Sequence, residues 1–193
     1  MSETHNQETL KARLAALLYE KSYMEGDFTL SSGRKSDYYF DCRQTSLNPE
    51  GAWLIGSIFL DMLKDTDAKA VAGMTLGADP LITATSLLAY RHDMYLPALI
   101  VRKQTKEHGA GRQIEGLANI NPGDGVVLLE DVVSTGGSVL KACKAVEDAG
   151  LKALSVFCVL DREEPGGAEA FAQAGYELRS IFTRKQLLAL ARK

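Results

Sequence analysis

The chain has 193 residues, of which 46% are hydrophobic and 24% are charged. This length is enough to bury one sizeable core and is short for two, so we expect a single domain spanning residues 1–193. The net charge of −3 argues against a nucleic-acid backbone as the main partner, because domains that bind one usually carry a basic balance.

The cysteines and the apolar runs narrow the class of protein further. Cys42, Cys143 and Cys158 are odd in number and far apart, which argues against a disulfide framework or a zinc site and favours reduced thiols used as small apolar residues. No apolar run approaches the roughly 20 residues that cross a bilayer, and the N-terminus has no apolar signal core. We therefore expect a soluble, cytoplasmic protein without a membrane or nucleic-acid partner.

Helical spacing of apolar residues appears over residues 8–21, and again after Asn48-Pro49, a pair typical of a helix start. From residue 69 onward, short apolar runs alternate with helical segments. Strands that are apolar on both faces and separated by helices indicate an α/β fold, with a central, mostly parallel sheet flanked by helices. The predicted strands are 69–74, 96–102, 126–130, 153–160 and 176–182, and the predicted helices are about 79–90, 137–149, 168–174 and a last one that opens on a Thr183/Gln186 capping box.

The segment VVLLEDVVSTGGS, residues 126–138, combines a buried strand, two acids and a small hydroxyl-rich turn before a helix. We expect the strand to end at Glu130, which would put Glu130 and Asp131 at the edge of the sheet where ligands bind. A glycine-rich turn at a helix N-terminus offers unpaired N–H groups to a phosphate, and the carboxylates could accept hydrogen bonds from sugar hydroxyls. The pattern predicts a ribose 5-phosphate site; the alternative is an ordinary strand-to-helix connection.

This segment resembles the phosphoribosyl pyrophosphate (PRPP) signature of the type I phosphoribosyltransferases. The resemblance implies the fold of that family, with a small N-terminal hood at about residues 22–48. It also implies that the acid pair binds the ribose hydroxyls, that the turn binds the 5′-phosphate, and that Asp131 is catalytic. The PRPP-binding residues implied here are Glu130, Asp131, Val132, Val133, Ser134, Thr135, Gly136, Gly137 and Ser138.

The stretch VRKQTKEHGAG, residues 101–111, concentrates positive charge in an otherwise acidic chain. Taken alone, such a run is usually a solvated face. It is similar to the catalytic loop of the orotate phosphoribosyltransferases, which implies that Arg102, Lys103, Lys106 and His108 bind PRPP and that Lys103 is catalytic, stabilising the departing pyrophosphate. The resemblance further implies a homodimer in which Arg102 and the loop 103–116 are shared across the interface, with the loop closing over PRPP.

The stretch FTLSSGRKSDYYFDCR, residues 28–43, is similar to the hood of the same family, which covers the pyrimidine. Tyr38 and Tyr39 are therefore candidate orotate-binding residues. Because they are adjacent, in a strand they point to opposite sides, so only one can face a base while the other packs. Two half-buried strand aromatics are the alternative. Many family members have a lysine where this chain has Ser31, and Arg34 or Lys35 could take its role.

Two further segments carry candidate contacts. Arg162 follows a predicted strand, and the resemblance places it against the carboxylate of orotate, with Ser134 also touching the base; a surface ion pair with Glu163 or Glu164 is the alternative. The turn AGMTLGADP, residues 72–80, departs from many relatives. Its backbone at Thr75, Leu76 and Gly77 could contact pyrophosphate, and Asp79 is equally well explained as a helix N-cap.

Together these motifs imply an orotate phosphoribosyltransferase, which joins orotate N1 to C1 of PRPP and releases pyrophosphate in pyrimidine (UMP) biosynthesis. Mg²⁺ is expected as a cofactor held mainly by PRPP, so no protein residue is assigned to it. Rival readings are an enzyme of the same fold that uses a purine or uracil, a PRPP-binding regulator that binds nucleic acid, and an uncharged ligand-binding module. Arg162 and the basic loop argue against the first, and the acidic balance argues against the second.

Overall fold

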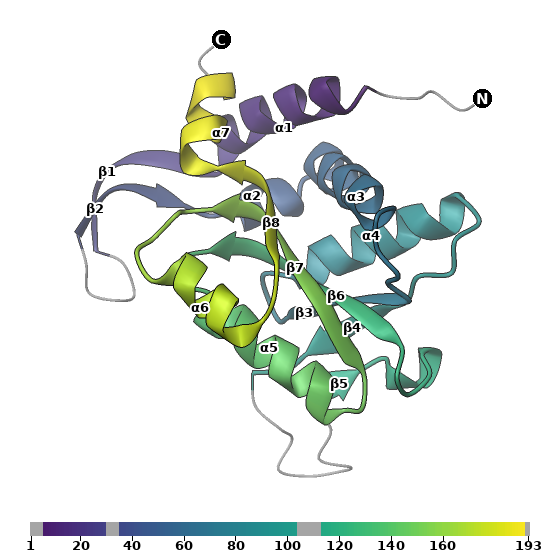
Figure 1. Cartoon of the computed structure of the whole chain (residues 1–193). Coiled ribbons are helices and arrows are strands. Elements are labelled where there is room, and N and C mark those ends of the chain that lie inside the picture. The colour runs from purple at the N-terminus through teal and green to yellow at the C-terminus, as the bar shows by residue number, and fades with distance from the viewer. Residues whose placement is uncertain (1–5, 30–34, 104–112, 192–193) are drawn as a thin grey trace.

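The computed structural model describes residues 6–29, 35–103 and 113–191. Its centre is a six-stranded sheet with the order β5-β4-β3-β6-β7-β8, parallel throughout except that β5 runs antiparallel to β4 (Figure 1). The strands are β3 (Ala70–Met74), β4 (Ala98–Val101), β5 (Ile114–Glu115), β6 (Gly125–Val133), β7 (Lys152–Asp161) and β8 (Leu178–Thr183).

Helices cover both faces of this sheet, as the strand pattern predicts (Figure 1). Alternate strand residues point to opposite faces: Val127 and Leu129 of β6 join one hydrophobic core, and Val126 and Leu128 join the other. The first core is covered by α1 (Gln7–Lys21), α3 (Pro49–Leu63), α4 (Asp79–Arg91) and α7 (Arg184–Ala191), and the second by α5 (Gly137–Asp148) and α6 (Gly167–Ala174).

The predicted helix ends are confirmed except at α4. Asn48 caps α3 through its side chain, and Thr183 and Gln186 exchange the two hydrogen bonds of a capping box, at 2.9 and 3.3 Å. Asp79 is not the N-cap of α4. Ala78 holds that position, while Asp79 lies in the first turn and accepts a hydrogen bond from the Thr75 hydroxyl at 2.8 Å. The Asp79-Pro80 pair therefore sits one residue further into the helix than its residue types predict.

Several strands differ from the prediction by one or two residues at their ends, and two segments differ more, namely β6 and the predicted loop that precedes it. β6 continues past Glu130 to Val133, because its pairing with β7 extends to the Val133–Asp161 pair. The segment 104–116, predicted as a loop, contains β5 at its end, where Ile114 pairs with Val101 of β4. A two-residue edge strand offers too few positions for an alternating pattern to be recognised.

The hood is a separate antiparallel hairpin, β1 (Tyr23–Thr29) and β2 (Lys35–Phe40), followed by the short helix α2 (Arg43–Ser46). It lies at one end of the main sheet, beside α7 (Figure 1). Tyr38 and Phe40 belong to the first hydrophobic core, so the hairpin is anchored to the rest of the chain by alternate residues of β2. Packing of this kind stabilises a two-stranded ribbon that is marginal in isolation.

The strand order creates a switch point next to β3. The chain passes from β3 to its neighbour β4 on one side and then returns to place β6 on the other side of β3. In such sheets the crevice beyond the carboxyl ends of the strands is the usual place for a ligand. The residues after β3 and β6 are therefore brought together at this edge.

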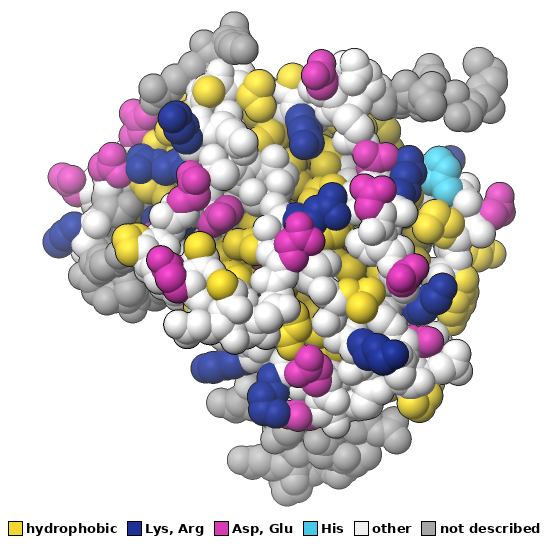
Figure 2. Space-filling model, viewed as in Figure 1, with side chains coloured by type: hydrophobic (Ala, Val, Ile, Leu, Met, Phe, Trp, Pro, Cys, Tyr) yellow, Lys and Arg dark blue, Asp and Glu magenta, His cyan; other side chains and the backbone are white. Residues whose placement is uncertain are grey.

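The surface charge and the apolar content of the helices can be compared with the expectation of no nucleic-acid or membrane partner. Acidic and basic side chains are interspersed over the face seen in Figure 2, without a continuous basic area among the coloured residues. Of the helices that the structure describes, none has the length and apolar content needed to cross a membrane.

Candidate active site

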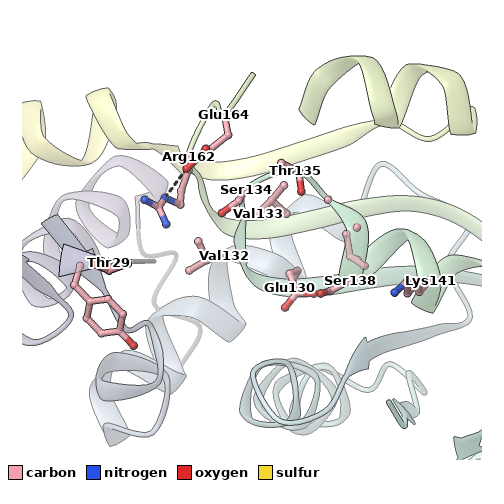
Figure 3. A pocket seen from close by; sticks show the side chains of 14 residues that line it. Thr29, Glu130, Val132, Val133, Ser134, Thr135, Ser138, Lys141, Arg162 and Glu164 are labelled. Atoms are coloured by element: carbon pink, nitrogen blue, oxygen red, sulfur yellow. Dashed lines mark ion pairs between the residues drawn. The ribbon is translucent and has the colours of Figure 1, made fainter. Parts of the chain in front are cut away.

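A cavity of about 750 Å³ opens beyond the carboxyl ends of β6 and β7. Figure 3 shows Glu130, Ser138 and Lys141 toward one end of it and Arg162 and Thr29 toward the other. Three separate segments build its wall, namely β6 with its turn into α5, the residues after β7, and the hood. The lining residues are Thr29, Tyr39, Glu130, Val132, Val133, Ser134, Thr135, Gly136, Gly137, Ser138, Val139, Lys141, Arg162 and Glu164.

The turn between β6 and α5 has the geometry of an anion site. Gly136 precedes the helix with φ of +80°, a left-handed conformation that favours glycine. A Cβ at this position would lie 2.6 Å from the ring of Phe171, which is buried in α6. No side-chain hydrogen bond caps α5, so its first N–H groups are available to a ligand.

Helix α6 supports this turn from behind. Its first residue, Gly167, approaches so closely that a Cβ there would lie 2.8 Å from the carbonyl oxygen of Ser134. Gly167 is buried, and Phe171 packs one turn further along the same helix. The turn is thus held between β6 and α6.

Glu130 lines the cavity from a position within β6, four residues from the start of the turn. Its side chain is 8% exposed, Oε1 accepts a hydrogen bond from the Asp131 N–H at 3.3 Å, and Oε2 is buried with no hydrogen-bond partner among the described residues. Burial, and then the charge of Asp131, raise the pKa of Glu130 well above its ordinary value, while the charge of Lys103 acts in the opposite direction. An unpartnered carboxyl oxygen facing a cavity is suited to accept a hydroxyl.

Asp131 follows Glu130 directly in β6, and the side chains of the two acids interact, which adds to the rise in the pKa of Glu130. The Asp131 Oδ1 accepts a hydrogen bond from the Val132 N–H at 2.8 Å, and Asp131 does not line the cavity. Its carboxylate packs against the turn after β3, where a Cβ on Gly77 would meet Oδ2 at 2.7 Å. Of the two acids, Glu130 therefore lines the cavity, whereas Asp131 lies against the neighbouring turn.

Arg162 marks the opposite end of the cavity. Its Nε donates a hydrogen bond to the Tyr38 hydroxyl at 2.8 Å and lies 3.5 Å from the Glu164 carboxylate. The Arg162 and Glu164 side chains are only 12% and 11% exposed, so this is not a surface ion pair. The expected alternation of the tyrosines is confirmed, since Tyr38 is 5% exposed and packs in the core, while Tyr39 is 37% exposed and lines the cavity.

Comparisons with known proteins agree with this geometry. The family model of the phosphoribosyl transferase domain matches residues 66–172, which is more than half of the chain. The orotate phosphoribosyltransferase of Thermosynechococcus vestitus is 47% identical over 180 residues, covering 93% of this chain and 94% of that protein. This chain belongs to the orotate phosphoribosyltransferase family.

Two further relatives extend the match over the length of the chain. The orotate phosphoribosyltransferase of Rhodopirellula baltica is 45% identical over 178 residues, covering 89% of this chain and 91% of that protein. The crystal structure of the Mycobacterium tuberculosis enzyme in complex with Fe(III) dicitrate superposes with a TM-score of 0.79 at 38% identity, covering 92% of this chain and 98% of that one. The type I phosphoribosyltransferase fold expected from the sequence is confirmed.

The structure describes only some of the basic residues that are expected to bind PRPP in this orotate phosphoribosyltransferase. Arg102 hydrogen-bonds Glu115 of β5 at 3.0 Å, and Lys103 is exposed close enough to Glu130 to influence its pKa. Lys106 and His108 lie outside the described residues, as do Ser31 and Arg34 of the hood. Lys35 hydrogen-bonds the Thr29 hydroxyl at 2.9 Å, next to the cavity. The backbone at 75–77 does not line the cavity as described.

Four lining residues of this orotate phosphoribosyltransferase cavity were not predicted from the sequence: Thr29, Val139, Lys141 and Glu164. Lys141 could have been found, because it follows Ser138 by three positions on a predicted helix and therefore lies on the same face. Glu164 follows Arg162 by two positions and was considered only as its ion-pair partner, whereas Thr29 reaches the cavity only through tertiary packing of distant segments. Sequence spacing gives no signal for that packing.

The donor set fits a cation that is held by the substrate more than by the protein. Among the described residues, no group of three or more His, Cys, Asp or Glu side chains is arranged to hold a metal ion. Glu130, which lines the cavity, has a buried carboxyl oxygen, Oε2, without a hydrogen-bond partner among the described residues. Mg²⁺ coordinated mainly by phosphate oxygens and water needs no more than one or two such protein ligands.

Proposed function

We propose that this orotate phosphoribosyltransferase transfers ribose 5-phosphate from PRPP to N1 of orotate, giving orotidine 5′-monophosphate and pyrophosphate for UMP synthesis. The observation that supports the assignment of site residues is a single cavity with a phosphate-type turn at one end and Arg162 at the other. Glu130 lies between them in the same wall. The related enzyme of Mycobacterium tuberculosis has been crystallised with PRPP.

At the phosphate end, the N–H groups of the turn and of the first residues of α5 donate to the 5′-phosphate. The hydroxyls of Ser134, Thr135 and Ser138 add donors around the same space. Lys141 contributes positive charge one helical turn further along. This end of the substrate is thereby fixed before any bond changes.

At the sugar, a ribose hydroxyl donates a hydrogen bond to the buried carboxylate of Glu130. The bond between C1 and the pyrophosphate oxygen breaks with its electron pair leaving on pyrophosphate, N1 of orotate forms the new bond to C1, and the proton lost from N1 passes to the departing pyrophosphate. Lys103 stabilises the negative charge that builds on the leaving group, together with Lys106 and His108 of the basic loop. Mg²⁺ would neutralise pyrophosphate charge when bound.

At the base end, the guanidinium of Arg162 pairs with the carboxylate of orotate, which uracil and the purines lack. Tyr39, the exposed member of the tyrosine pair, packs against the ring of the base. Arg162 is nearly buried, so this pairing takes place in a partly desolvated environment where charged hydrogen bonds are stronger.

We also propose that the enzyme is a homodimer that acts in the cytoplasm. A group of exposed apolar side chains at the end of α4 and before β4 supports a second copy as the partner: Leu87, Tyr90, Met94 and Tyr95 are between 41% and 75% exposed. They line one groove of about 330 Å³. Three free, buried cysteines agree with a reducing compartment.

One assay tests the proposed reaction. The absorbance of orotate is followed with PRPP and Mg²⁺, and each of the three components is omitted in turn. We expect a decrease in absorbance only when all three are present. Turnover of uracil or a purine in place of orotate would instead assign the chain to another reaction of the same fold.

A further inference from the structure

Tyr38, on β2 of the hood, contacts the arginine at the base-binding end of the cavity. Its hydroxyl accepts the 2.8 Å hydrogen bond from Arg162 Nε, and the Arg162 guanidinium carbon lies 4.8 Å from the Tyr38 ring centroid. Tyr38 is buried and does not line the cavity. It therefore holds Arg162 without occupying the space that a base would fill.

Arg184, the first residue of α7, lies against the same tyrosine. Its guanidinium carbon is 3.8 Å from the Tyr38 ring centroid, and its Nη2 approaches the Asp37 carboxylate at 3.3 Å. Tyr23 of β1 stacks on Tyr38 with 5.5 Å between ring centroids. The tyrosine is thus fixed both by its partner strand and by a helix that is far from it in sequence.

These contacts determine which part of the Arg162 guanidinium is engaged by the protein. Both the Tyr38 hydroxyl and the Glu164 carboxylate meet Nε. A guanidinium held through Nε can present its two terminal nitrogens as parallel donors, which match a carboxylate. The tyrosine hydroxyl is neutral, so it orients Arg162 without cancelling the charge that an anionic base requires.

We propose that Tyr38 and Arg184 are positioning residues for Arg162 and thereby set the affinity for the carboxylate of the base. This rests on the proposed function, in which Arg162 receives the carboxylate of orotate. Arg184 acts through the tyrosine: its charge lies over the ring and holds it, and the hydroxyl of that ring holds Arg162. The last helix of the fold therefore contributes to base binding without touching the base.

The first test removes only the hydroxyl. Tyr38→Phe should raise KM for orotate about fivefold, the effect of one hydrogen bond, while KM for PRPP stays unchanged. In an Arg162→Ala background the same substitution should have no further effect on KM for orotate, because the group that it positions is gone. Tyr19→Phe is the matched control, since Tyr19 belongs to the same aromatic stack but contacts Tyr23 and not Tyr38.

The second test acts on the helix. Arg184→Met should raise KM for orotate in the same way, and Arg184→Lys should restore most of the loss, because a cation remains over the ring. Arg179→Met is the matched control: Arg179 also lies over an aromatic ring, Phe157, at 4.8 Å, but on a part of β8 away from Tyr38. Thermal unfolding of each variant shows whether the fold is intact. If Tyr38→Phe does not fold, the comparison of Arg184→Met with Arg184→Lys still tests the proposal.

Two results would overturn the inference while leaving the reaction in place. One is an equal loss from Tyr38→Phe with and without Arg162, and the other is a rise in the KM values for orotate and PRPP together, as a general structural defect would cause. Wild-type protein that does not consume orotate would contradict the proposed function itself. Wild-type turnover with no effect of Arg162→Ala on KM for orotate would contradict the assignment of Arg162.

Discussion

Single residues in the cavity owe their properties to the strand or helix that carries them. Glu130 and Asp131 are the two acids of a mostly apolar strand, and burial of the Glu130 side chain raises its pKa. The sequence predicted Glu130 as a site residue, and in the structure Glu130 lines the cavity; the sequence also predicted that only one of Tyr38 and Tyr39 could face a base. No signal in the sequence indicated that Thr29 lines the cavity, because the position of Thr29 depends on where distant segments meet.

The raised pKa of Glu130 predicts how its replacement changes stability with pH. A carboxyl whose pKa is raised by folding stabilises the fold below its unfolded pKa of about 4.3, and that contribution is lost as pH rises through the folded pKa. Glu130→Gln has no such loss. In the absence of ligand we expect the variant to gain melting temperature relative to wild type as pH increases above about 4.3, measured by thermal unfolding at a series of pH values.

The same variant should bind PRPP more weakly, because an amide is a poorer acceptor for a ribose hydroxyl than a carboxylate. A stability difference between Glu130→Gln and wild type that stays constant across this pH range would contradict a raised pKa of Glu130 in the folded protein. Unchanged PRPP affinity would contradict the role of Glu130 in holding the sugar.

Lys141 allows a second prediction at the scale of one residue. Lys141→Ala should raise KM for PRPP about tenfold or more, since a hydrogen bond to a charged group contributes about 1.5–3 kcal/mol. KM for orotate should change little, because Lys141 lies at the opposite end of the cavity from Arg162. Steady-state kinetics with each substrate varied in turn measures this difference.

The control for Lys141 is Lys144→Ala on the same helix. Lys144 pairs with Asp148 at 2.7 Å and does not line the cavity. An equal rise in KM for PRPP in both variants would show that the general charge of α5, and not the position of Lys141, is responsible.

At the scale of elements, the order of strands and helices follows from the alternation of apolar runs, and most of it was predicted. The extent of β6 was not, because Glu130 and Asp131 resemble residues that end a strand, whereas the ladder with β7 continues to Val133. Both acids therefore lie within the strand, and Glu130 lines the cavity while Asp131 does not. The support that α6 gives to the phosphate turn was also beyond prediction, since only the packed structure brings Gly167 to Ser134.

That support makes a prediction for Gly136. Gly136→Ala combines about 1–2 kcal/mol of backbone strain at positive φ with a collision between the new Cβ and the Phe171 ring, 2.6 Å away. We expect a greater loss of unfolding free energy than strain alone would give, together with weaker PRPP binding. Urea unfolding and PRPP kinetics measure the two effects.

Gly150→Ala, at the other end of α5, isolates the strain. Gly150 has φ of +81° and no atom within 4 Å of the position of a Cβ. If both variants lose the same unfolding free energy, the contact between α6 and the phosphate turn does not constrain position 136.

At the scale of the whole molecule, the mostly parallel sheet flanked by helices agrees with what the pattern of apolar runs indicated. The homodimer stays a prediction, and the exposed apolar group at the end of α4 is the surface proposed for its interface. Leu87→Glu should shift the protein from dimer to monomer in sedimentation, because Leu87 is 62% exposed and a charge there would be buried by a second copy. Activity should fall in parallel, since the loop is expected to complete the partner's site.

Leu47→Glu is the corresponding control, because Leu47 is 72% exposed and lies outside this group. Equal sedimentation of wild type and both variants as monomers would contradict the dimer. Dissociation caused by Leu47→Glu and not by Leu87→Glu would move the interface to the hood.

The cavity is assembled in two different ways. The wall proposed to hold the phosphate comes from one stretch of chain, from Glu130 to Lys141, whereas the wall proposed to hold the base joins Thr29 and Tyr39 of the hood to Arg162 and Glu164, which follow β7. We therefore expect mutations in the hood or in α7 to alter the preference for the base while binding of the sugar phosphate is retained. With this division, the part of the site that binds the activated sugar can be conserved during evolution. Changes in the other part alone could then adapt the enzyme to a different acceptor.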